Sequence, residues 1–324
     1  MGEILEKKLI ELITPCHNEK DCVRPFYEEV KRVFETQLHD YRYIITYVDD
    51  GSYDNTLAII KELAEEVDNV RYLALSRNFG KEAAMYAGLA KCVGDYVVML
   101  DSDLQHPPVL IPEMLKAVEE EGFDCATARR VSRKGEPPIR SFLSSSFYHV
   151  FNKVTSINLV SGSTDYRLMT RQVAKAVMSL PETERFTKGI YSWIGFKNKW
   201  IEYVNVERTA GKTKWSLRGL ARYSVNGFFA FATTPLRIAT YLGMLICIVD
   251  LIYIIKLIPE AISYGRVPGG TGTTQLLLTA GLGGLIIFIL GIIGEYMARI
   301  YLEVKRRPIY LIRESNIEDE DFNV

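Results

Sequence analysis

The sequence has little cysteine, no excess of charge of either sign and no long apolar run at its start. Its net charge of -1 at pH 7 argues against broad nucleic-acid binding, which needs a basic excess. The first apolar run, Leu9–Ile13, is too short for a cleavable signal peptide, so we expect any later apolar run to be a permanent anchor. The cysteines show no C-x-x-C and no metal-site spacing, which indicates a reduced, cytosolic soluble part; they are Cys16, Cys22, Cys92, Cys125 and Cys247.

Long apolar runs lie only near the C-terminus. Ile238–Ile258 would form about 31 Å of helix at about 1.5 Å per residue, enough to cross a bilayer core, and Leu276–Ile293 is of similar length. Basic residues flank the outer ends of this pair, whereas the loop 259–274 carries only Arg266. The positive-inside rule therefore predicts a multi-pass cell-membrane protein with the catalytic part and both termini in the cytoplasm. The alternative is a pair of buried helices in a soluble protein.

Residues 8–128 alternate short apolar segments with amphipathic ones. We predict strands at Lys8–Thr14, Tyr43–Val48, Val70–Leu75, Tyr96–Leu100 and Cys125–Ala128, with helices near 20–36, 54–67, 80–92 and 109–121. This alternation predicts an α/β fold with a doubly wound parallel sheet, whose ligands bind at the carboxyl ends of the strands. Polar clusters fall at those ends, at 15–19, 49–52 and 101–105.

The run Asp101-Ser102-Asp103-Leu104-Gln105 follows the fourth predicted strand. If extended backbone continues through it, Asp101 and Asp103 point the same way and can bind one cation, with Gln105 as a third oxygen ligand. Mg²⁺ or Mn²⁺ held there would neutralise a diphosphate leaving group. The alternative is that the aspartates only cap a turn. A nucleotide site and a membrane anchor on one chain predict chemistry at the membrane surface, on a substrate with a lipid tail.

The chain divides into four predicted parts. They are a cytosolic domain at 1–215, a juxtamembrane amphipathic helix at 216–234, a two-helix anchor at 235–298 and a cytosolic tail at 299–324. The juxtamembrane segment has apolar residues at helical spacing and arginines opposite, so it either lies in the lipid interface or packs on the soluble domain. From Glu314 onward the tail is acidic, and we expect it to be disordered.

Six motifs in a fixed order carry a resemblance to a known family. They are T-P-C-H-N-E (14–19), V-D-D-G-S (48–52), S-R-N-F-G-K (76–81), D-S-D-L-Q-H-P-P (101–108), T-D-Y-R-L-M (164–169) and R-T-A-G-K-T-K-W (208–215). With the two spans, the set resembles the inverting family-two glycosyltransferases. It is most similar to their polyprenyl-phosphate branch, typified by dolichol-phosphate mannose synthase and bacterial undecaprenyl-phosphate glucosyltransferases. The chain departs from that pattern at His17, where tyrosine is usual, and at Thr213, where serine is frequent.

The resemblance implies a GT-A-type domain that transfers one hexosyl unit, with inversion, from a nucleotide diphosphate sugar to polyprenyl phosphate. The sugar nucleotide would be a UDP-sugar and the bacterial acceptor undecaprenyl phosphate. The residues implied to bind the nucleotide sugar are Pro15, His17, Glu19, Val48, Asp50, Asp101, Ser102, Arg208 and Lys214. The acceptor phosphate is assigned to Arg129 and Arg140, and the catalytic role to Asp165. Membrane lipid is the further partner, nucleic acid is not expected, and a homo-oligomer is left open.

The role of Asp165 is open on chemical grounds. A carboxylate on the acceptor side can take a proton as a general base. However, a phosphate monoester has a second pKa of about 6 and is mostly ionised at neutral pH, so Asp165 can instead orient the acceptor or stabilise charge on the sugar. A structural pairing with Arg167 is the third alternative.

Two other functions compete with single transfer. A processive polysaccharide synthase would normally carry Q-x-x-R-W and more spans, and a non-catalytic, membrane-anchored nucleotide-sugar-binding protein would not need the retained charged motifs. The identity of the sugar is not readable from these residues.

Overall fold

The computed structural model describes residues 7–131, 148–155, 157–203, 225, 227–264 and 272–318. The chain divides into two compact units. The first combines residues up to Lys153 with Ile157–Ala230 and Pro308–Val324, and the second combines Val154–Ser156 with Phe231–Arg307. The segment after the long helices thus returns to the first unit, which carries the site described below.

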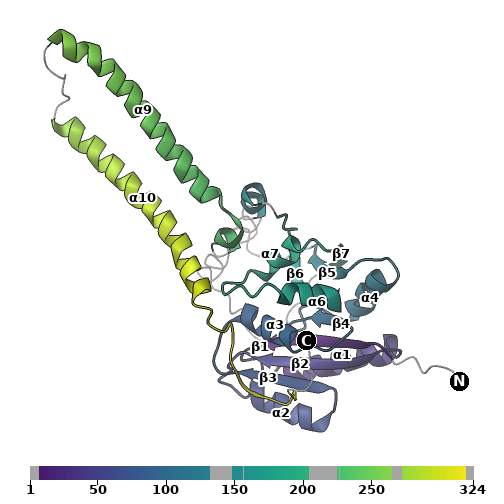
Figure 1. Ribbon diagram of the computed structural model, residues 1–324. Helices are drawn as coiled ribbons and strands as arrows, with labels where there is room; N and C mark the ends of the chain where they lie inside the picture. The colour runs from purple at the N-terminus through teal and green to yellow at the C-terminus, as the bar shows by residue number, and fades with distance from the viewer. Residues whose placement is uncertain are drawn as a thin grey trace. The chain divides into compact units, whose positions relative to one another are not determined.

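The N-terminal half of the first unit is a parallel β/α arrangement (Figure 1). Its strands are β1 (Leu9–Cys16), β2 (Arg42–Asp49), β3 (Val70–Leu75) and β4 (Tyr96–Met99). The helices between and after them are α1 (Val23–Gln37), α2 (Thr56–Glu66), α3 (Lys81–Ala90), the short 3-10 turn η1 (Pro108–Leu110) and α4 (Ile111–Glu119). The predicted alternation is confirmed.

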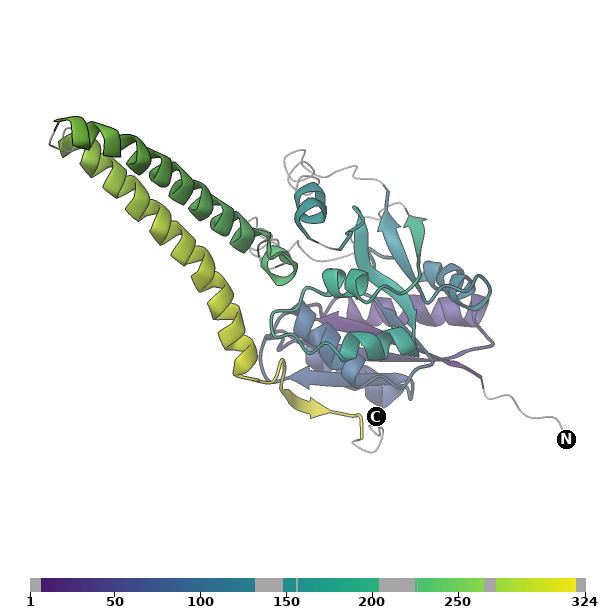
Figure 2. The same cartoon turned by 45° about the horizontal axis from the view of Figure 1, so that its top comes forward.

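The remainder of the sheet is mixed, which corrects the expectation of a parallel sheet. It contains β5 (Cys125–Arg130), β6 (Ser163–Thr170) and β7 (Asn198–Tyr203), with α6 (Arg171–Met178) and α7 (Thr187–Trp193) along the chain (Figure 2). The strand order is β7-β5-β6-β4-β1-β2-β3-β8. β6 lies antiparallel between β4 and β5, so a strand from late in the sequence enters the centre of the sheet.

The edge strand β8 (Ile312–Ser315) pairs antiparallel with β3. The Asn316 side chain extends this pairing, since its Oδ1 accepts the N–H of Tyr72 at 2.7 Å and its Nδ2 donates to the Val70 carbonyl at 3.2 Å. Glu314 pairs with Lys61. The expectation of disorder from Glu314 onward is therefore wrong for Glu314–Asn316, because an unpaired edge of β3 offers these residues backbone partners.

A buried carboxylate ties three segments of the parallel half together. Glu11 on β1 is fully buried and accepts hydrogen bonds from Thr46 Oγ1 at 2.6 Å, Val93 N at 2.7 Å and Gly94 N at 3.1 Å. Burial raises the pKa of Glu11 even though these hydrogen bonds favour its charged form. Its three partners fix β1 against β2 and against the turn that leads into β4.

The second unit contains two long helices, α9 (Thr234–Tyr264) and α10 (Gly272–Val304), which lie side by side (Figures 1 and 2). Within the described residues, one segment, Gly281–Val304, is long and apolar enough to cross a membrane, with a mean hydropathy of 1.9. The first predicted span falls within α9 and stays a prediction. Most of the predicted juxtamembrane helix lies outside the described residues.

Candidate active site

The loops at the carboxyl ends of the two central strands carry backbone strain. Asn18 follows β1 with a φ of 53°, and Leu104 follows β4 with a φ of 56°. Both values lie in the left-handed region, which costs a residue other than glycine about 1 kcal/mol or more. Asn18 is held there because its Oδ1 accepts the N–H of Tyr53 at 2.9 Å and its own N–H donates to Ser52 Oγ at 2.9 Å. Strain of this kind gathers at functional sites.

Asp50 organises the loop that leads into α3. Its carboxylate accepts the backbone N–H of Phe79 at 2.7 Å and of Gly80 at 2.9 Å. Burial raises the pKa of Asp50, although these two hydrogen bonds act in the opposite direction. The next residue, Gly51, has a φ of +64°, and an added Cβ would lie 2.5 Å from the Arg77 backbone carbon. The loops after β2 and β3 therefore fit closely together.

His17 links the same loops. Its Nδ1 lies 2.9 Å from the Asp50 carbonyl oxygen, which can only accept, so Nδ1 carries the proton. In the neutral ring Nε2 then accepts from the side-chain amides of Asn18 at 3.0 Å and Asn78 at 3.1 Å. The ring meets Tyr53 edge-on, with 5.9 Å between centroids, and Tyr53 is 88% exposed. His17 is thus held in one tautomer beside an open aromatic surface.

Some of the residues predicted to bind the nucleotide are accessible to solvent and others are buried; they lie on or directly after β1, β2 and β4. Glu19 is half-buried, and its carboxylate accepts a hydrogen bond from the fully buried Ser102, which joins the loops after β1 and β4. Pro15 and Val48 are buried. An added Cβ on Gly88 of α3 would lie 3.1 Å from Val48 Cγ2, so the Val48 side chain packs beneath that helix.

The centre of the site is an ion-pair cluster that joins the two halves of the sheet. Lys81 Nζ lies 2.8 Å from Asp101 Oδ2 and 2.8 Å from Asp165 Oδ2, and Lys188 Nζ lies 4.0 Å from Asp165 Oδ1. Lys81 begins α3, Asp101 follows β4, Asp165 is on β6 and Lys188 is in the first turn of α7. The four side chains are 20 to 32% exposed, so solvent reaches the cluster.

Opposite charges set the pKa values in this cluster. Burial alone would lower the pKa of Lys81, but the charges of Asp101 and Asp165 outweigh it and raise that pKa. Burial alone would raise the pKa of Asp165, but Lys81 and Lys188 hold it well below its ordinary value. At neutral pH Lys81 is therefore positively charged and Asp165 is an ionised carboxylate. A carboxylate with so low a pKa is a weak proton acceptor, which favours an orienting or electrostatic role for Asp165 over that of a general base.

The structure does not pair Asp165 with Arg167. Within the described residues the ion pairs of Asp165 are those with Lys81 and Lys188. The Arg167 guanidinium instead lies over the Tyr191 ring, 3.3 Å from its centroid. The expected ion pair between Asp165 and Arg167 is therefore not formed. Instead, Lys81 contacts both Asp165 and Asp101.

The aspartate pair does not continue a strand. β4 ends at Met99, and Asp101, Ser102 and Asp103 form a turn that leads to the left-handed Leu104, so the predicted alternation of side chains does not extend to them. Asp103 Oδ1 accepts the backbone N–H of Gln105 at 3.1 Å, as a turn-capping residue does. No group of three or more His, Cys, Asp or Glu side chains suited to a metal occurs within the described ranges.

The chemistry of these residues nevertheless fits a divalent cation. The Asp101 carboxylate already binds a positive ion, the Lys81 ammonium, at 2.8 Å and is 27% exposed. Carboxylate oxygens reached by solvent are the ligands that Mg²⁺ and Mn²⁺ prefer.

Two aromatic residues and a histidine lie next to the cluster and were not assigned a role from the sequence. His106 Nδ1 is 2.6 Å from Tyr203 Oη, and the His106 ring lies 5.9 Å from that of Tyr166. Burial lowers the pKa of His106, and the charge of Lys81 lowers it further against the opposing effect of nearby carboxylates. His106 is therefore neutral at pH 7 and joins β7 to the loop after β4.

The predicted acceptor-phosphate residues are only partly placed. Arg129 at the end of β5 is partly exposed, with its NH1 3.3 Å from Glu202 Oε1 and its Nε 3.2 Å from the Ser161 carbonyl. Arg140, Arg208 and Lys214 lie outside the described residues.

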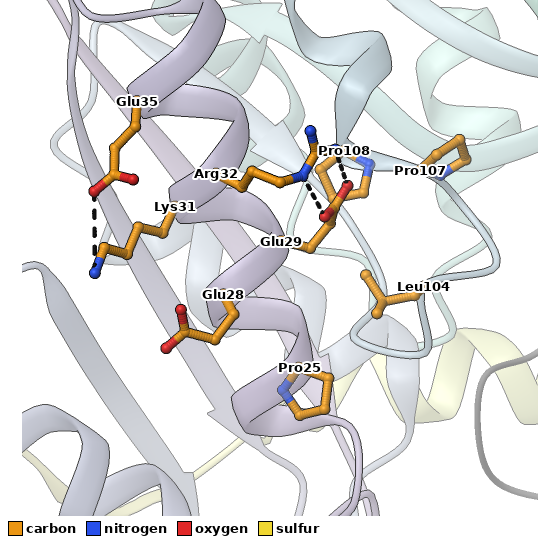
Figure 3. A pocket seen from close by; sticks show the side chains of 9 residues that line it. All are labelled: Pro25, Glu28, Glu29, Lys31, Arg32, Glu35, Leu104, Pro107 and Pro108. Carbon is orange, nitrogen blue, oxygen red and sulfur yellow. Dashed lines mark hydrogen bonds and ion pairs between the residues drawn. The ribbon is translucent and has the colours of Figure 1, made fainter.

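A groove of about 660 Å³ lies apart from this chemistry, between α1 and the loop before η1 (Figure 3). Lys81, Asp101 and Asp165 are not among its lining residues, which are Pro25, Glu28, Glu29, Lys31, Arg32, Glu35, Leu104, Pro107 and Pro108. Four of its charged side chains form ion pairs with each other, Arg32 with Glu29 and Lys31 with Glu35. We therefore assign the candidate active site to the ion-pair cluster.

Lys188 was missed by sequence reasoning, and Lys81 entered only as the last residue of the motif at 76–81. A sequence signal exists for Lys81, which falls at the start of the helix predicted near 80–92, where the helix dipole disfavours a positive charge. Lys188 lies in the first turn of α7, a helix that was not predicted. A nearby carboxylate offsets this unfavourable interaction between the lysine charge and the helix dipole. Glu82 connects the two helix starts, because its carboxylate accepts the N–H of Thr187 at 3.1 Å.

Comparison with known proteins identifies relatives over nearly the whole chain. The model of the Glycosyl transferase family 2 matches residues 11–178. A Bacillus subtilis (strain 168) protein named as a glycosyltransferase, CsbB, is 42% identical over 98% of this chain and 95% of its own length. The prophage bactoprenol glucosyl transferase homolog of Escherichia coli (strain K12) is 37% identical over 94% of this chain and 98% of its own length.

Among solved structures the likeness is more distant. The mannosyl-3-phosphoglycerate synthase of Rubrobacter xylanophilus superposes with a TM-score of 0.46 at 18% identity, over 68% of this chain and 71% of its own. At this distance no residue of that enzyme is carried over to this chain.

Proposed function

The chain belongs to glycosyl transferase family 2, and we propose that it transfers one hexosyl unit from a nucleotide diphosphate sugar to polyprenyl phosphate, with inversion. The observation that carries the proposal is the convergence of Asp101 and Asp165 on Lys81. It unites the motif implied to hold the sugar diphosphate with the motif implied to serve the acceptor. A single displacement needs both substrates at one point, and this cluster offers charges of both signs there.

Asp101, with Asp103 and Gln105 on the same turn, would hold Mg²⁺ or Mn²⁺. The ion would supply Lewis-acid stabilisation of the diphosphate that leaves. The residues of the chain do the rest. Asp165 orients the acceptor or stabilises positive charge on the sugar, and Lys81 and Lys188 offer cationic partners to phosphate oxygens.

The acceptor is proposed from the relatives and from the membrane segment. Two proteins matched over more than nine-tenths of this chain, from E. coli and from Shigella phage SfII, are named for bactoprenol glucosyl transfer. Gly281–Val304 is apolar enough to hold the chain at a bilayer, where a polyprenyl phosphate resides. We propose UDP-glucose as the first sugar nucleotide to test and undecaprenyl phosphate as the acceptor.

The test is transfer by membranes that contain the full chain. Membranes are incubated with radiolabelled UDP-glucose and a panel of other nucleotide sugars, and the lipid fraction is extracted and separated. We expect one labelled polyprenyl phosphate carrying one sugar, strongly reduced in membranes that carry Asp165→Asn. A polymeric product would replace the proposal with a processive synthase. Nucleotide binding without any labelled lipid would replace it with a non-catalytic binding protein.

The proposed membrane arrangement has two spans and cytoplasmic termini. In whole cells, a reporter fused after Val324 should be cytoplasmic, and a cysteine placed at Ser263 should react with an impermeant reagent from outside. Reaction at Ser263 only after permeabilisation would reverse the arrangement or remove the first span. This outcome would leave the transfer reaction itself untouched.

A further inference from the structure

Lys81 lies where a cation bridges carboxylates from both halves of the sheet. Its Nζ makes contacts of 2.8 Å with one oxygen of Asp101 and 2.8 Å with one oxygen of Asp165. The side chain is 32% exposed, so the ion pair is open to displacement by an ion from solution. Because Asp165 also has Lys188 at 4.0 Å, it keeps a positive neighbour if Lys81 moves. Within the described residues, Asp101 forms its ion pair with Lys81.

A divalent ion bound at Asp101 Oδ2 would share an oxygen atom with the Lys81 ammonium. Mg²⁺ binds carboxylate oxygens at about 2.0–2.1 Å, which would bring it close to an ammonium hydrogen-bonded to the same atom. Two positive ions at that separation repel each other strongly in a partly buried site. Asp101 Oδ2 can therefore serve the lysine or the metal, but not both at full strength.

We infer that Lys81 is a built-in cation that competes with the divalent metal for Asp101 and moves away from Asp101 when the metal binds. The inference rests on the proposed function for the identity of the metal site. Before metal binding, Lys81 pairs with both carboxylates and holds Asp165 in place. After metal binding, its ammonium stays near Asp165 and is available to a phosphate oxygen. Lys81 is on this account a positioning residue, and it sets the affinity of the site for metal.

The test measures Mn²⁺ binding to the purified full chain in detergent, without nucleotide, from the electron paramagnetic resonance signal of free Mn²⁺. Removing the competing charge in Lys81→Met should tighten Mn²⁺ binding by between about tenfold and a thousandfold, the range by which an adjacent opposite charge changes the proton affinity of a carboxylate. Lys81→Ala should behave in the same way, which guards against a packing fault of the methionine. Lys81→Arg keeps the charge and should stay within about threefold of wild type.

Lys188→Met is the matched control. It removes one charge from the same cluster, but its ammonium contacts Asp165 rather than Asp101, so Mn²⁺ affinity should change by less than about threefold. The double variant Lys81→Met with Asp101→Asn should lose the tight binding, which would tie the gain to Asp101. Equal Mn²⁺ affinity in Lys81→Met and wild type, or a gain that persists without Asp101, would overturn the inference. Tight Mn²⁺ binding by a chain that transfers no sugar would instead sink the proposed function and leave this inference intact.

Discussion

The two halves of the sheet differ in how their strands are joined. β1 to β4 are parallel neighbours connected by single helices, and their hydrophobic pattern alone located them. In contrast, β6 lies antiparallel between β4 and β5, although 32 residues (131–162) separate the end of β5 from the start of β6 along the chain. The parallel half presents Asp101 from one loop, and β6 brings Asp165 to the same lysine. The candidate active site therefore lies at the junction between the two halves of the sheet.

The largest effect on activity is expected from replacing Asp165, the residue that the mixed half of the sheet contributes to the site. Asp165→Asn should preserve nucleotide-sugar affinity but lower formation of lipid-linked sugar by about a hundredfold to a thousandfold, the loss that removing one electrostatic group from a transition state typically causes. The measurement pairs nucleotide binding with single-turnover lipid product. Wild-type turnover in this variant would leave Asp165 with a structural role only.

The pH dependence of the same variant separates the two chemical roles. Because Lys81 and Lys188 outweigh burial and keep the pKa of Asp165 well below its ordinary value, the group stays ionised throughout the neutral range. Wild type and Asp165→Asn should then show the same rise with pH through the acceptor phosphate's pKa of about 6, at different heights. A rise that is steeper in the variant alone would indicate a general base.

The parallel half contributes Asp101 and Asp103, and replacing either should weaken the effect of the metal on turnover. Asp101→Asn or Asp103→Asn should lower turnover by about tenfold to a hundredfold, because the leaving diphosphate loses part of its counter-charge. EDTA should abolish transfer by wild type, and Mg²⁺ or Mn²⁺ should restore it. Full activity in metal-free buffer would show that cationic side chains of the chain supply all the positive charge that the reaction needs.

The difference between the halves also explains what the sequence could predict. Local periodicity found the parallel strands and their helices, and the motifs located Asp101 and Asp165. Strand pairing across long separations has no local signal, so the antiparallel entry of β6 and the return of β8 to the edge of β3 were not anticipated. The alternation expected through Asp101 and Asp103 was wrong because β4 ends at Met99 and the chain turns at Leu104. The ion pair between Lys188 and Asp165 depends on the position of α7, and none of the six motifs includes that helix.

The next prediction concerns the stability of the parallel half of the sheet, where Glu11 is buried. Glu11→Ala would leave the hydroxyl of Thr46 and the N–H groups of Val93 and Gly94 without their buried acceptor, at a cost of about 3 kcal/mol of unfolding free energy. Denaturant unfolding of the full chain in detergent measures it. Glu62→Ala, at an exposed position of α2, is the control and should change stability by less than about 0.5 kcal/mol.

Glu11 also carries a pH signature. Its pKa is raised in the folded chain, chiefly by burial, so the folded state holds this proton more tightly than the unfolded state. The stabilisation is complete below the ordinary value of 4.5 and is lost as pH rises from there through the folded-state pKa. Glu11→Gln cannot ionise, so the stability difference between wild type and this variant should change across that window. A difference that is constant with pH would mean that Glu11 has an unshifted pKa.

The smallest effect is expected at the edge that β8 covers. Asn316→Ala removes the hydrogen bonds to Tyr72 N and the Val70 carbonyl and should cost about 1 kcal/mol. Asn316→Asp is the matched variant, since it keeps an acceptor for Tyr72 N but loses the donor to Val70, and it should fall between wild type and alanine. Hydrogen exchange followed by mass spectrometry should show faster exchange in β3 peptides, with β1 and β4 peptides unchanged. Equal acceleration across all three strands would mean that the C-terminal strand supports the whole parallel half, because loss of an edge contact alone opens only the strand beside it.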